Sequence, residues 1–352
     1  MQYSAYLLTV NEIRQKTIVK IRLCGYICFV INSQHKQPYM DIRLAKEIYG
    51  TPWHVDPVTF SQYSKILESM TNGFKYDVEV QGNAFGIMTP TMGFVAAAKK
   101  GEKKSSTPAG SIAMYNFDSV ITKGGGMSHK GTKDIAARFQ EMEADSNIAG
   151  HVFNIESGGG SAVAVKYMLE VASKGVRKKP LVTYAEDIMA SAAMYIGSVS
   201  DYIYANAKDA TIGSIGTMVQ FDGYKSGEED KTGKRHIRIY ASQSINKNKG
   251  YVDAINDFNY DLIKKEMLDP HAAEFIRDME NNRPNITPIQ KTGAVFRADE
   301  CIGTLIDGIG SLEMACGKVI ELSKSKSGNI NKVSKTSKSN KNSMEISQEK
   351  YD

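Results

Sequence analysis

The sequence predicts an α/β fold, with a mainly parallel sheet and outer helices, for residues 111–322. Short apolar segments with strand character alternate there with amphipathic segments of helical spacing, an order typical of a parallel sheet covered by helices. Stretches rich in small residues, SGGGS and DIMAS, follow two of the predicted strands. Because loops beyond the carboxyl ends of such strands hold the chemistry, we expect the functional site there.

The elements of this domain follow one another at regular spacing. The predicted strands are SIAMYNF, HVFNIES, PLVTYAE and DYIYANA, and the predicted helices are GTKDIAARFQEMEAD, AVAVKYMLEVASKG and SAAMYIGSVS. In the first helix, Ile135, Phe139 and Met142 fall on one side, as expected of a helix that packs on a sheet.

Three regions flank the domain. Residues 1–39 are a leader whose nine-residue apolar run, LCGYICFVI, is too short to span a bilayer and has no small-residue cleavage site after it. We expect that the native chain starts at Met40, or that the run is a weak apolar segment such as a buried strand. Residues 40–110 predict a small, mainly helical N-terminal region, with SQYSKILESM as a helix, and a linker from residue 99. Residues 323–352, rich in Lys, Ser and Asn, are expected to be disordered.

Charge and cysteine usage exclude several classes of protein. The net charge is +5, but seven lysines against three acidic residues in the predicted tail carry +4 of it. The rest of the chain therefore offers no clear nucleic-acid site, although the tail could contact DNA or an acidic scaffold. The four cysteines fit neither a disulfide framework nor a zinc site, and we expect them to be reduced. No metal, nucleotide or cofactor motif is present, so no cofactor is expected.

Two stretches can carry chemistry. The three glycines after Ser157 let the backbone approach a ligand and present N–H groups to an oxyanion, although a glycine run at a strand end is at least as often a simple turn. Ser191 begins an apolar helix between small residues. It is either a helix-capping serine or a nucleophile whose following N–H, that of Ala192, faces the developing oxyanion.

Three stretches together resemble a known family. IESGGGSAVAV, MASAAMYIGSVSDYIYANAKDATIGSIGTM and VFRADECIGTLIDGIGSLEMA are similar, in order, to motifs of the SppA-type signal peptide peptidases and their phage relatives, the procapsid proteases. The resemblance covers about residues 111–320. Ala192 and Ala193 are closest to the phage-type members, whereas Gly158 stands where the family usually has Pro. The resemblance implies a ClpP/crotonase-like fold and a serine peptidase with a Ser-Lys dyad.

The resemblance also assigns roles to individual residues. It implies that Ser191 is the nucleophile and that Gly159 and Ala192 supply the N–H groups of the oxyanion hole. It places the lysine base about fifty residues after the serine, in IRIYASQSINKNKGYVDAIN.

Two lysines in that segment are candidates for the base. The pattern S-x-x-K-N favours Lys247, and Lys249 is the alternative. A lysine base must be a neutral amine, so burial or a nearby positive charge has to lower its pKa. The family resemblance further implies that Ser214, in TIGSIG, orients this lysine.

Three other functions compete with a Ser-Lys peptidase. A Ser-His-Asp triad is disfavoured because the first histidine after Ser191 is His236, in a charged stretch that predicts a surface turn. A crotonase-like acyl-CoA enzyme needs acidic side chains near the glycines, and Glu156 is expected to point into the sheet or at solvent instead. An inactive structural capsid protein is the third alternative.

The biological role is narrowed by the same resemblance. It favours a phage or prophage head-maturation protease, in the bacterial cytoplasm or the phage procapsid, over a cellular signal-peptide peptidase. The expected partners are protein or peptide substrates, either scaffold and capsid proteins or signal peptides. The family assembles as rings, which implies a homo-oligomer whose active sites are completed or shielded by neighbours. No transmembrane helix is predicted, so membrane association is disfavoured.

Overall fold

The computed structural model describes residues 21–23, 26–28, 52–55, 84–96, 107–125, 130–221 and 223–325. The chain divides into two compact units, Met1–Tyr39 and Met40–Asp352. In the first unit, β1 (Ile21–Leu23) and β2 (Tyr26–Cys28) pair as a short antiparallel hairpin. The second unit holds everything that is described below.

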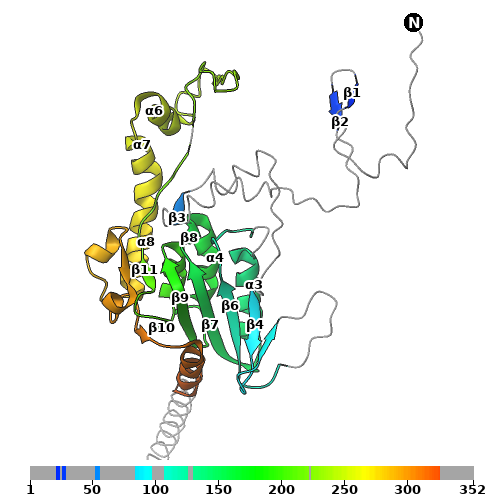
Figure 1. Cartoon of the computed structure of the whole chain (residues 1–352), viewed down its shortest axis with the longest axis vertical. Helices are drawn as coiled ribbons and strands as arrows, with labels where there is room; N and C mark the ends of the chain where they lie inside the picture. The colour runs from blue at the N-terminus through cyan, green and yellow to red at the C-terminus, as the bar shows by residue number, and fades with distance from the viewer. Residues whose placement is uncertain are drawn as a thin grey trace, which may run out of the picture. The chain divides into compact units, whose positions relative to one another are not determined.

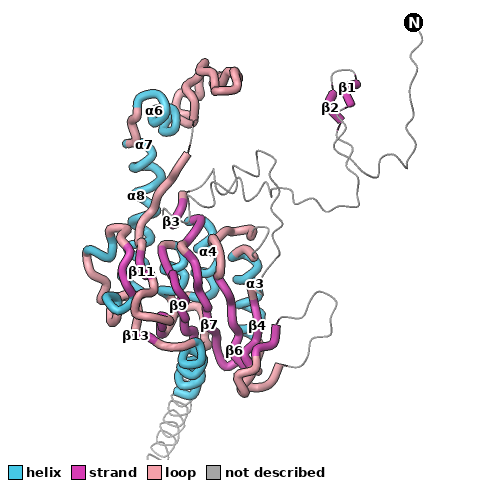
Figure 2. Tube along the Cα trace, in the orientation of Figure 1, coloured by secondary structure: helices cyan, strands magenta, loops and turns pink. Residues whose placement is uncertain are grey.

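A nine-stranded, mainly parallel sheet forms the centre of the second unit, with β4, β6, β7, β9 and β11 side by side in Figure 2. Its order is β12-β11-β9-β7-β6-β4-β5, and β10 pairs with both β9 and β13. Pairs from β6 through β7 and β9 to β10 and β11 are parallel, and antiparallel pairs occur only towards the two edges of the described sheet. The strands are β4 (Phe85–Met88), β5 (Phe94–Ala96), β6 (Ser111–Phe117), β7 (Ile148–Ser157), β9 (Leu181–Ala190), β10 (Tyr202–Ala205), β11 (Thr211–Gly213), β12 (Val295–Arg297) and β13 (Gly308–Ile309).

Helices cover both faces of this sheet (Figure 1). On one face lie α3 (Thr132–Ala144), α4 (Ala162–Ala172), α5 (Ala192–Ser198) and α8 (Asp269–Asn282). The helical residues 312–325 cover the other face. Successive strand residues alternate between the two cores: Phe153 belongs to the first and Val152 to the second. This period of two is what a strand buried on both faces requires.

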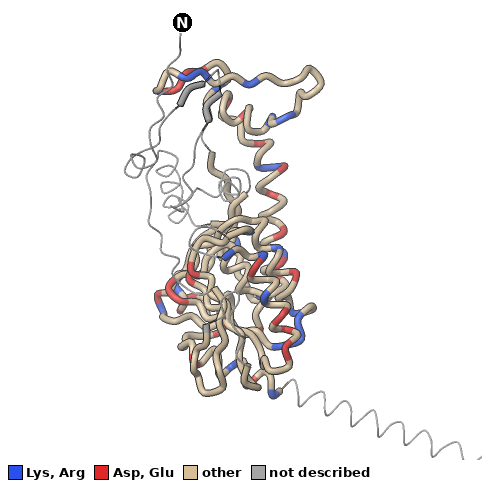
Figure 3. Tube along the Cα trace, turned by 90° about the vertical axis from the view of Figure 1, so that its right-hand side faces the viewer, with Lys and Arg blue, Asp and Glu red and all other residues tan. Residues whose placement is uncertain are grey.

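After β11 the chain leaves the sheet and builds a projection, which we call the arm (residues 223–268). It contains α6 (Lys249–Asp257), α7 (Asp261–Ile263) and a π-helical segment, Lys264–Leu268, that leads into α8. In Figure 1 α6 and α7 lie beyond the end of α8, away from the sheet. Apolar side chains of the arm are exposed, among them Ile239 at 90% and Ile245 at 77%. Both basic and acidic residues occur along the arm and α8 (Figure 3), and between Asp230 and Asp253 the charged residues are all Lys or Arg.

The predicted strands and helices of the domain are all present, with some different bounds. β9 continues to Ala190, so the stretch DIMA belongs to the strand rather than to a loop. The extension is possible because the β7–β9 register shifts after Ile155, and Ile188–Ala190 then pair with β11. The last helix runs to residue 325, three beyond the predicted end of the domain, and the rest of the predicted tail lies outside the described residues.

Only short segments of residues 40–110 are among the described residues. The described parts of residues 40–110 are strands and turns rather than helices: β3 (Trp53–Val55), β4 and β5. β4 pairs antiparallel with β6, so a distant partner rather than local periodicity decides its structure. The predicted helix SQYSKILESM lies outside the described residues. Over the parts of the chain that the structure describes, no helix has the length and apolar character needed to cross a membrane.

Candidate active site

Ser191 stands at the junction between β9 and α5. Its backbone has φ 57° and ψ −118°, in a region that residues with a side chain rarely adopt. The Ser191 N–H donates to the Gly213 carbonyl at 2.8 Å, which fixes the junction to the end of β11. The residue is 1% exposed. Such a strained strand-to-helix turn marks Ser191 as a candidate functional residue rather than an ordinary helix cap.

The glycine strand, β8 (Gly159–Ser161), passes directly against this serine. Gly159 has φ 110°, and a Cβ built on it would lie 2.9 Å from Ser191 Cβ and 3.0 Å from the Ala192 nitrogen. A side chain at residue 159 would therefore enter the space in front of Ser191. The glycine is required by both its backbone angle and this close approach.

The N–H groups of the two predicted oxyanion donors, Gly159 and Ala192, differ in their hydrogen bonding. Ala192 is the first residue of α5, and the first amides of a helix have no acceptor within the helix. The Gly159 N–H donates to Ser157 Oγ at 3.2 Å, and Ser157 Oγ in turn donates to the Ser119 carbonyl at 2.6 Å. The two donors are thus adjacent, but one of them is engaged by the protein's own serine.

Ser214 follows β11 and lies in the same neighbourhood. Its backbone has φ 53°, and its N–H donates to the Ala294 carbonyl at 2.8 Å. The preceding residue, Gly213, is the one that accepts the Ser191 N–H. The structure therefore brings four predicted site residues into one region: Ser191, Gly159, Ala192 and Ser214.

The two candidate lysines are not brought to this region. Lys247 and Lys249 are exposed residues of the arm. Lys249 Nζ pairs with the Asp253 carboxylate at 2.8 Å, one turn further along α6. Among the described residues, no hydrogen bond joins Ser191 to a lysine or histidine side chain. No dyad is thus assembled within the described part of one chain.

Two other lysines have a lowered pKa but lie at the end of β9 opposite to Ser191. Partial burial lowers the pKa of Lys174 and that of Lys179, whose Nζ also donates to two backbone carbonyls. Both lysines precede β9, whereas Ser191 follows it. The length of a ten-residue strand separates them from the serine, so neither is a candidate base.

The histidines of the domain have other partners. His236 Nε2 lies 3.0 Å from Asp230 Oδ2 in a turn of the arm, and its ring stacks on Tyr224. His151 is buried against Glu143, with 2.7 Å between Nε2 and Oε2. Burial lowers the pKa of His151. Burial by itself raises the pKa of Glu143, but its hydrogen bonds to His151 and to backbone N–H groups bring it down to about 2. His151 and His236 therefore have structural roles.

The acidic residue next to the glycines is Glu156. Glu156 is exposed, and its pKa is raised first by partial burial and then by the carboxylates of Glu186 and Asp187. Within the described ranges, no group of three or more His, Cys, Asp or Glu side chains could hold a metal ion. The two cysteines described in full, Cys301 and Cys316, are buried free thiols.

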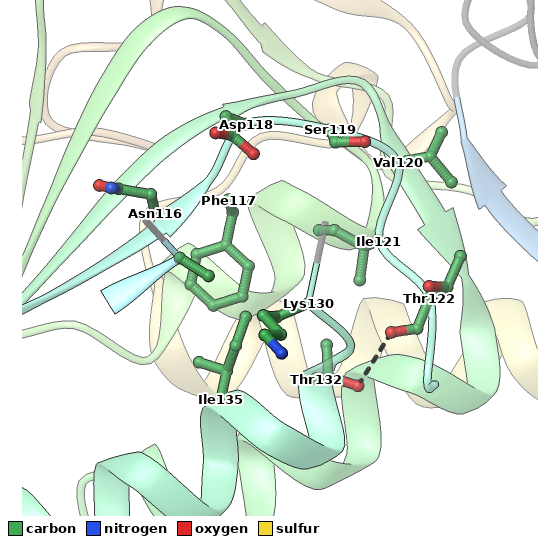
Figure 4. Close-up of a pocket in the computed structure, with 11 residues that line it drawn as sticks. Asn116, Phe117, Asp118, Ser119, Val120, Ile121, Thr122, Lys130, Thr132 and Ile135 are labelled. Atoms are coloured by element: carbon green, nitrogen blue, oxygen red, sulfur yellow. Dashed lines mark hydrogen bonds between the residues drawn. The ribbon is translucent and has the colours of Figure 1, made fainter. Parts of the chain in front are cut away.

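Figure 4 shows a surface hollow beside Ile121, the residue that pairs with one edge of the glycine strand. It lies between the end of β6 and the start of α3, and Phe117, Ile121 and Ile135 contribute apolar side chains to it. Ile121 connects this hollow to the candidate active site, because its backbone forms hydrogen bonds with Gly159 and Ser161 of the glycine strand. None of the predicted catalytic residues lines the hollow.

One segment at the site was missed by the sequence analysis. β3 pairs antiparallel with the glycine strand, and the His54 carbonyl oxygen lies 2.2 Å from where a Cβ on Gly159 would be. The nearest sequence signal is that Trp53 is the single tryptophan of the chain. Nothing local in TPWHVDP indicates pairing with a segment more than one hundred residues away.

Part of the chain is similar to a known protein family. Residues 174–326 match peptidase family S49, a range that contains Ser191, Ser214 and both candidate lysines and begins after the glycine strand. A protein of Methanocaldococcus jannaschii, named as an assumed protease, is 26% identical over 193 residues, covering 52% of this chain and 58% of that protein. The chain thus spans little more than half the length of this relative.

Solved structures with a similar arrangement include a membrane-bound stomatin-specific protease and an enoyl-CoA hydratase/isomerase from Acinetobacter baumannii. The first is 13% identical, covers 58% of this chain and 80% of its own, and has a TM-score of 0.33. The second is 13% identical, covers 62% and 79%, and has a TM-score of 0.34. The family match and the parallel sheet with outer helices agree with the predicted ClpP/crotonase-like fold. Residues 174–326 of the chain are thus similar to peptidase family S49.

Proposed function

We propose that this protein is a serine endopeptidase in which Ser191 is the nucleophile. The observation that carries the proposal is the strained turn at Ser191, with Gly159 and the Ala192 amide packed directly against it. A glycine and a first-turn amide beside a serine at a strand end supply the two N–H donors that an acyl-transfer site needs.

The proposed chemistry combines these positions with a lysine base. Ser191 Oγ attacks the carbonyl carbon of the scissile peptide bond, and its proton passes to a neutral lysine amine. The oxyanion of the tetrahedral intermediate accepts hydrogen bonds from the Gly159 and Ala192 N–H groups. The C–N bond breaks as the lysine returns the proton to the leaving amine, which leaves an acyl-enzyme ester on Ser191. Water then attacks this ester, and the lysine again accepts and returns a proton.

We assign the base to Lys247 and expect it to reach Ser191 from a second copy of the chain. Lys249 is paired with Asp253, whereas the Lys247 side chain makes no hydrogen bond to any described residue. Both lysines are on the arm, together with apolar side chains as exposed as Ile239 and Ile245. Such exposed apolar residues favour contact with another subunit. A homo-oligomer would place the arm of one copy over the serine of the next.

Casein cleavage tests the nucleophile and the base. Ser191→Ala, Lys247→Ala and Lys249→Ala are compared with the wild type after each is confirmed as folded by circular dichroism. We expect Ser191→Ala and Lys247→Ala to lose activity by at least a factor of 10³, and Lys249→Ala to retain most of it. Activity that survives Ser191→Ala would refute the proposed mechanism. Loss in Lys249→Ala with full activity in Lys247→Ala would move the base to Lys249.

Co-expression separates a base within the chain from a base of a neighbour. Cells that make both Ser191→Ala and Lys247→Ala subunits can form mixed oligomers. A base in trans restores activity, because an intact serine on one subunit meets an intact lysine on the next. If the base acts in cis, every site lacks one of the two groups and the mixture stays inactive.

The finer role that we propose is head maturation in a phage or prophage. Ala192 and Ala193 after the nucleophile, and the Lys-rich segment beyond residue 323, support it. Purified protein is incubated with a phage scaffold protein and with a synthetic signal peptide. Preferential cleavage of the scaffold is expected, and preferential cleavage of the signal peptide would assign the cellular role instead.

A further inference from the structure

The glycine strand has two edges, and both are occupied. On its inner edge, the Ile121 N–H donates to the Gly159 carbonyl at 2.9 Å, and the Ser161 N–H donates to the Ile121 carbonyl at 2.8 Å. On its outer edge, β3 pairs antiparallel with it, with His54 opposite Gly160. The ladder continues where the Ala162 N–H donates to the Pro52 carbonyl at 3.1 Å.

The other side of β3 is paired as well. The Trp53 N–H donates to the Met218 carbonyl at 2.9 Å, and the Met218 N–H donates back to the Trp53 carbonyl at 2.9 Å. Met218 belongs to the segment that leads away from Ser214. The segment Pro52–Val55 therefore lies as an extended strand between two stretches of backbone, both of which begin at the catalytic region. An unfolded peptide binds to exposed strand edges in this way, through main-chain hydrogen bonds on its sides.

All three side chains of β3 are enclosed. Trp53 is 1%, His54 2% and Val55 4% exposed. In a two-stranded ribbon on a protein surface, alternate side chains face solvent, so burial of three in a row means that the segment fills a groove.

The His54 side chain is held by the second wall of this groove. Its Nδ1 lies 3.0 Å from the Gly216 carbonyl and 3.0 Å from Thr217 Oγ1, and its ring centroid is 4.8 Å from that of Phe275. Burial lowers its pKa to about 4, so the ring is neutral near pH 7 and can donate its Nδ1 proton to Gly216. The segment is thus bound by side-chain as well as main-chain contacts.

The segment lies directly against the candidate active site. The His54 carbonyl lies over Gly159, Ser191 is almost fully buried, and the Gly159 N–H is turned to Ser157. A peptide substrate that uses the same strand edges could not bind while β3 is in place.

We propose that Pro52–Val55 is an intramolecular pseudo-substrate: it occupies the groove in which an extended peptide substrate binds, and it must leave before Ser191 can react. The inference rests on the proposed function, because it takes Ser191 as the nucleophile. It goes further by naming the segment of the chain that holds the enzyme in a closed state. It also names the two backbone stretches, β8 and Met218, to which a substrate would bind in place of this segment.

Reaction of Ser191 with a fluorophosphonate probe tests the proposal, since labelling requires only access to an activated serine. Trp53→Ala removes the largest buried side chain of the segment, and Val55→Asp places a charge where it cannot stay buried, so both variants should release β3. We expect each to label at least ten times faster than the wild type, and one folded variant is sufficient. Phe85→Ala, which removes an aromatic ring from β4, is the matched control and should label at the wild-type rate. A peptide of residues 51–57 added to the faster variant should slow labelling again, and a scrambled peptide should not.

The outcomes separate the two proposals. Labelling of wild type and both variants at equal rates would overturn the pseudo-substrate and leave the serine peptidase intact. Slow labelling in the wild type, acceleration in the variants and competition by the peptide would support it. A complete absence of labelling in every protein, with folded variants, would overturn the proposed function and the inference with it.

Discussion

Substitution of Gly159 by alanine tests the geometry of the site most directly. The new Cβ would lie 2.2 Å from the His54 carbonyl oxygen, 2.9 Å from Ser191 Cβ and 3.0 Å from the Ala192 nitrogen. The first contact is relieved if β3 leaves, but the other two belong to the site itself and remain. The φ of 110° adds backbone strain of about 1–3 kcal/mol. Displacement of one oxyanion donor costs a factor of about 10²–10³ in kcat, or about 3–4 kcal/mol of transition-state stabilisation.

The assay is kcat/KM on an unstructured peptide substrate, together with urea unfolding of each variant. Gly175→Ala is the matched control, because Gly175 is an exposed turn residue with nothing within 4 Å of its Cβ position. We expect Gly159→Ala to lose activity by at least a factor of about 10² while it remains folded, and Gly175→Ala to keep wild-type activity. Wild-type kcat/KM in a folded Gly159→Ala would show that the Gly159 N–H is not part of the oxyanion hole.

Three predictions concern stability. Folding lowers the pKa of His54 from 6.5 to about 4, so the unfolded chain binds this proton first as the pH falls. The free energy of unfolding should therefore decrease by about 3 kcal/mol between about pH 6.5 and pH 4. Urea unfolding at both pH values should show a smaller decrease in His54→Asn, and an equal decrease would refute the assignment. Arg177→Met should cost about 3–5 kcal/mol in the same assay, because the buried guanidinium pairs with both Asp201 oxygens and with three backbone carbonyls; a cost below 1 kcal/mol would contradict the pairing. Gly317→Ala should raise stability by about 0.5–1 kcal/mol, since Gly317 is exposed in a helix with open space at its Cβ position; a decrease in the unfolding midpoint would argue against that helix.

Local signals in the sequence were sufficient for the elements of the domain. Short apolar segments identified the strands between residues 111 and 210, because a strand buried on both faces is apolar along most of its length, and apolar positions at a spacing of about 3.6 identified the helices. Ser191 and the glycines were singled out because small residues at strand ends are themselves a local feature. The spacing of those residues led to a family resemblance that the S49 match confirms.

The described strand β4 could not be predicted in the same way. β4 is a strand because it pairs with β6, and a four-residue segment carries too few apolar positions to establish a period. The extension of β9 through Asp187–Ala190 likewise depends on a register shift against β7 and on pairing with β11. Strand pairing is a contact between distant segments, so the choice of partner is not written in either segment alone.

The sequence by itself determined which residue types could do the chemistry, and only the tertiary structure decided which of them meet. Gly159 and Ser191 are packed together because β7 and β9 are neighbours in the sheet, whereas Lys247 and Lys249 are carried away from them on the arm. Trp53–Val55 pairs with the glycine strand although more than one hundred residues separate the two in the chain. Side-chain chemistry is a property of each residue, but proximity results from packing and main-chain pairing over the whole domain.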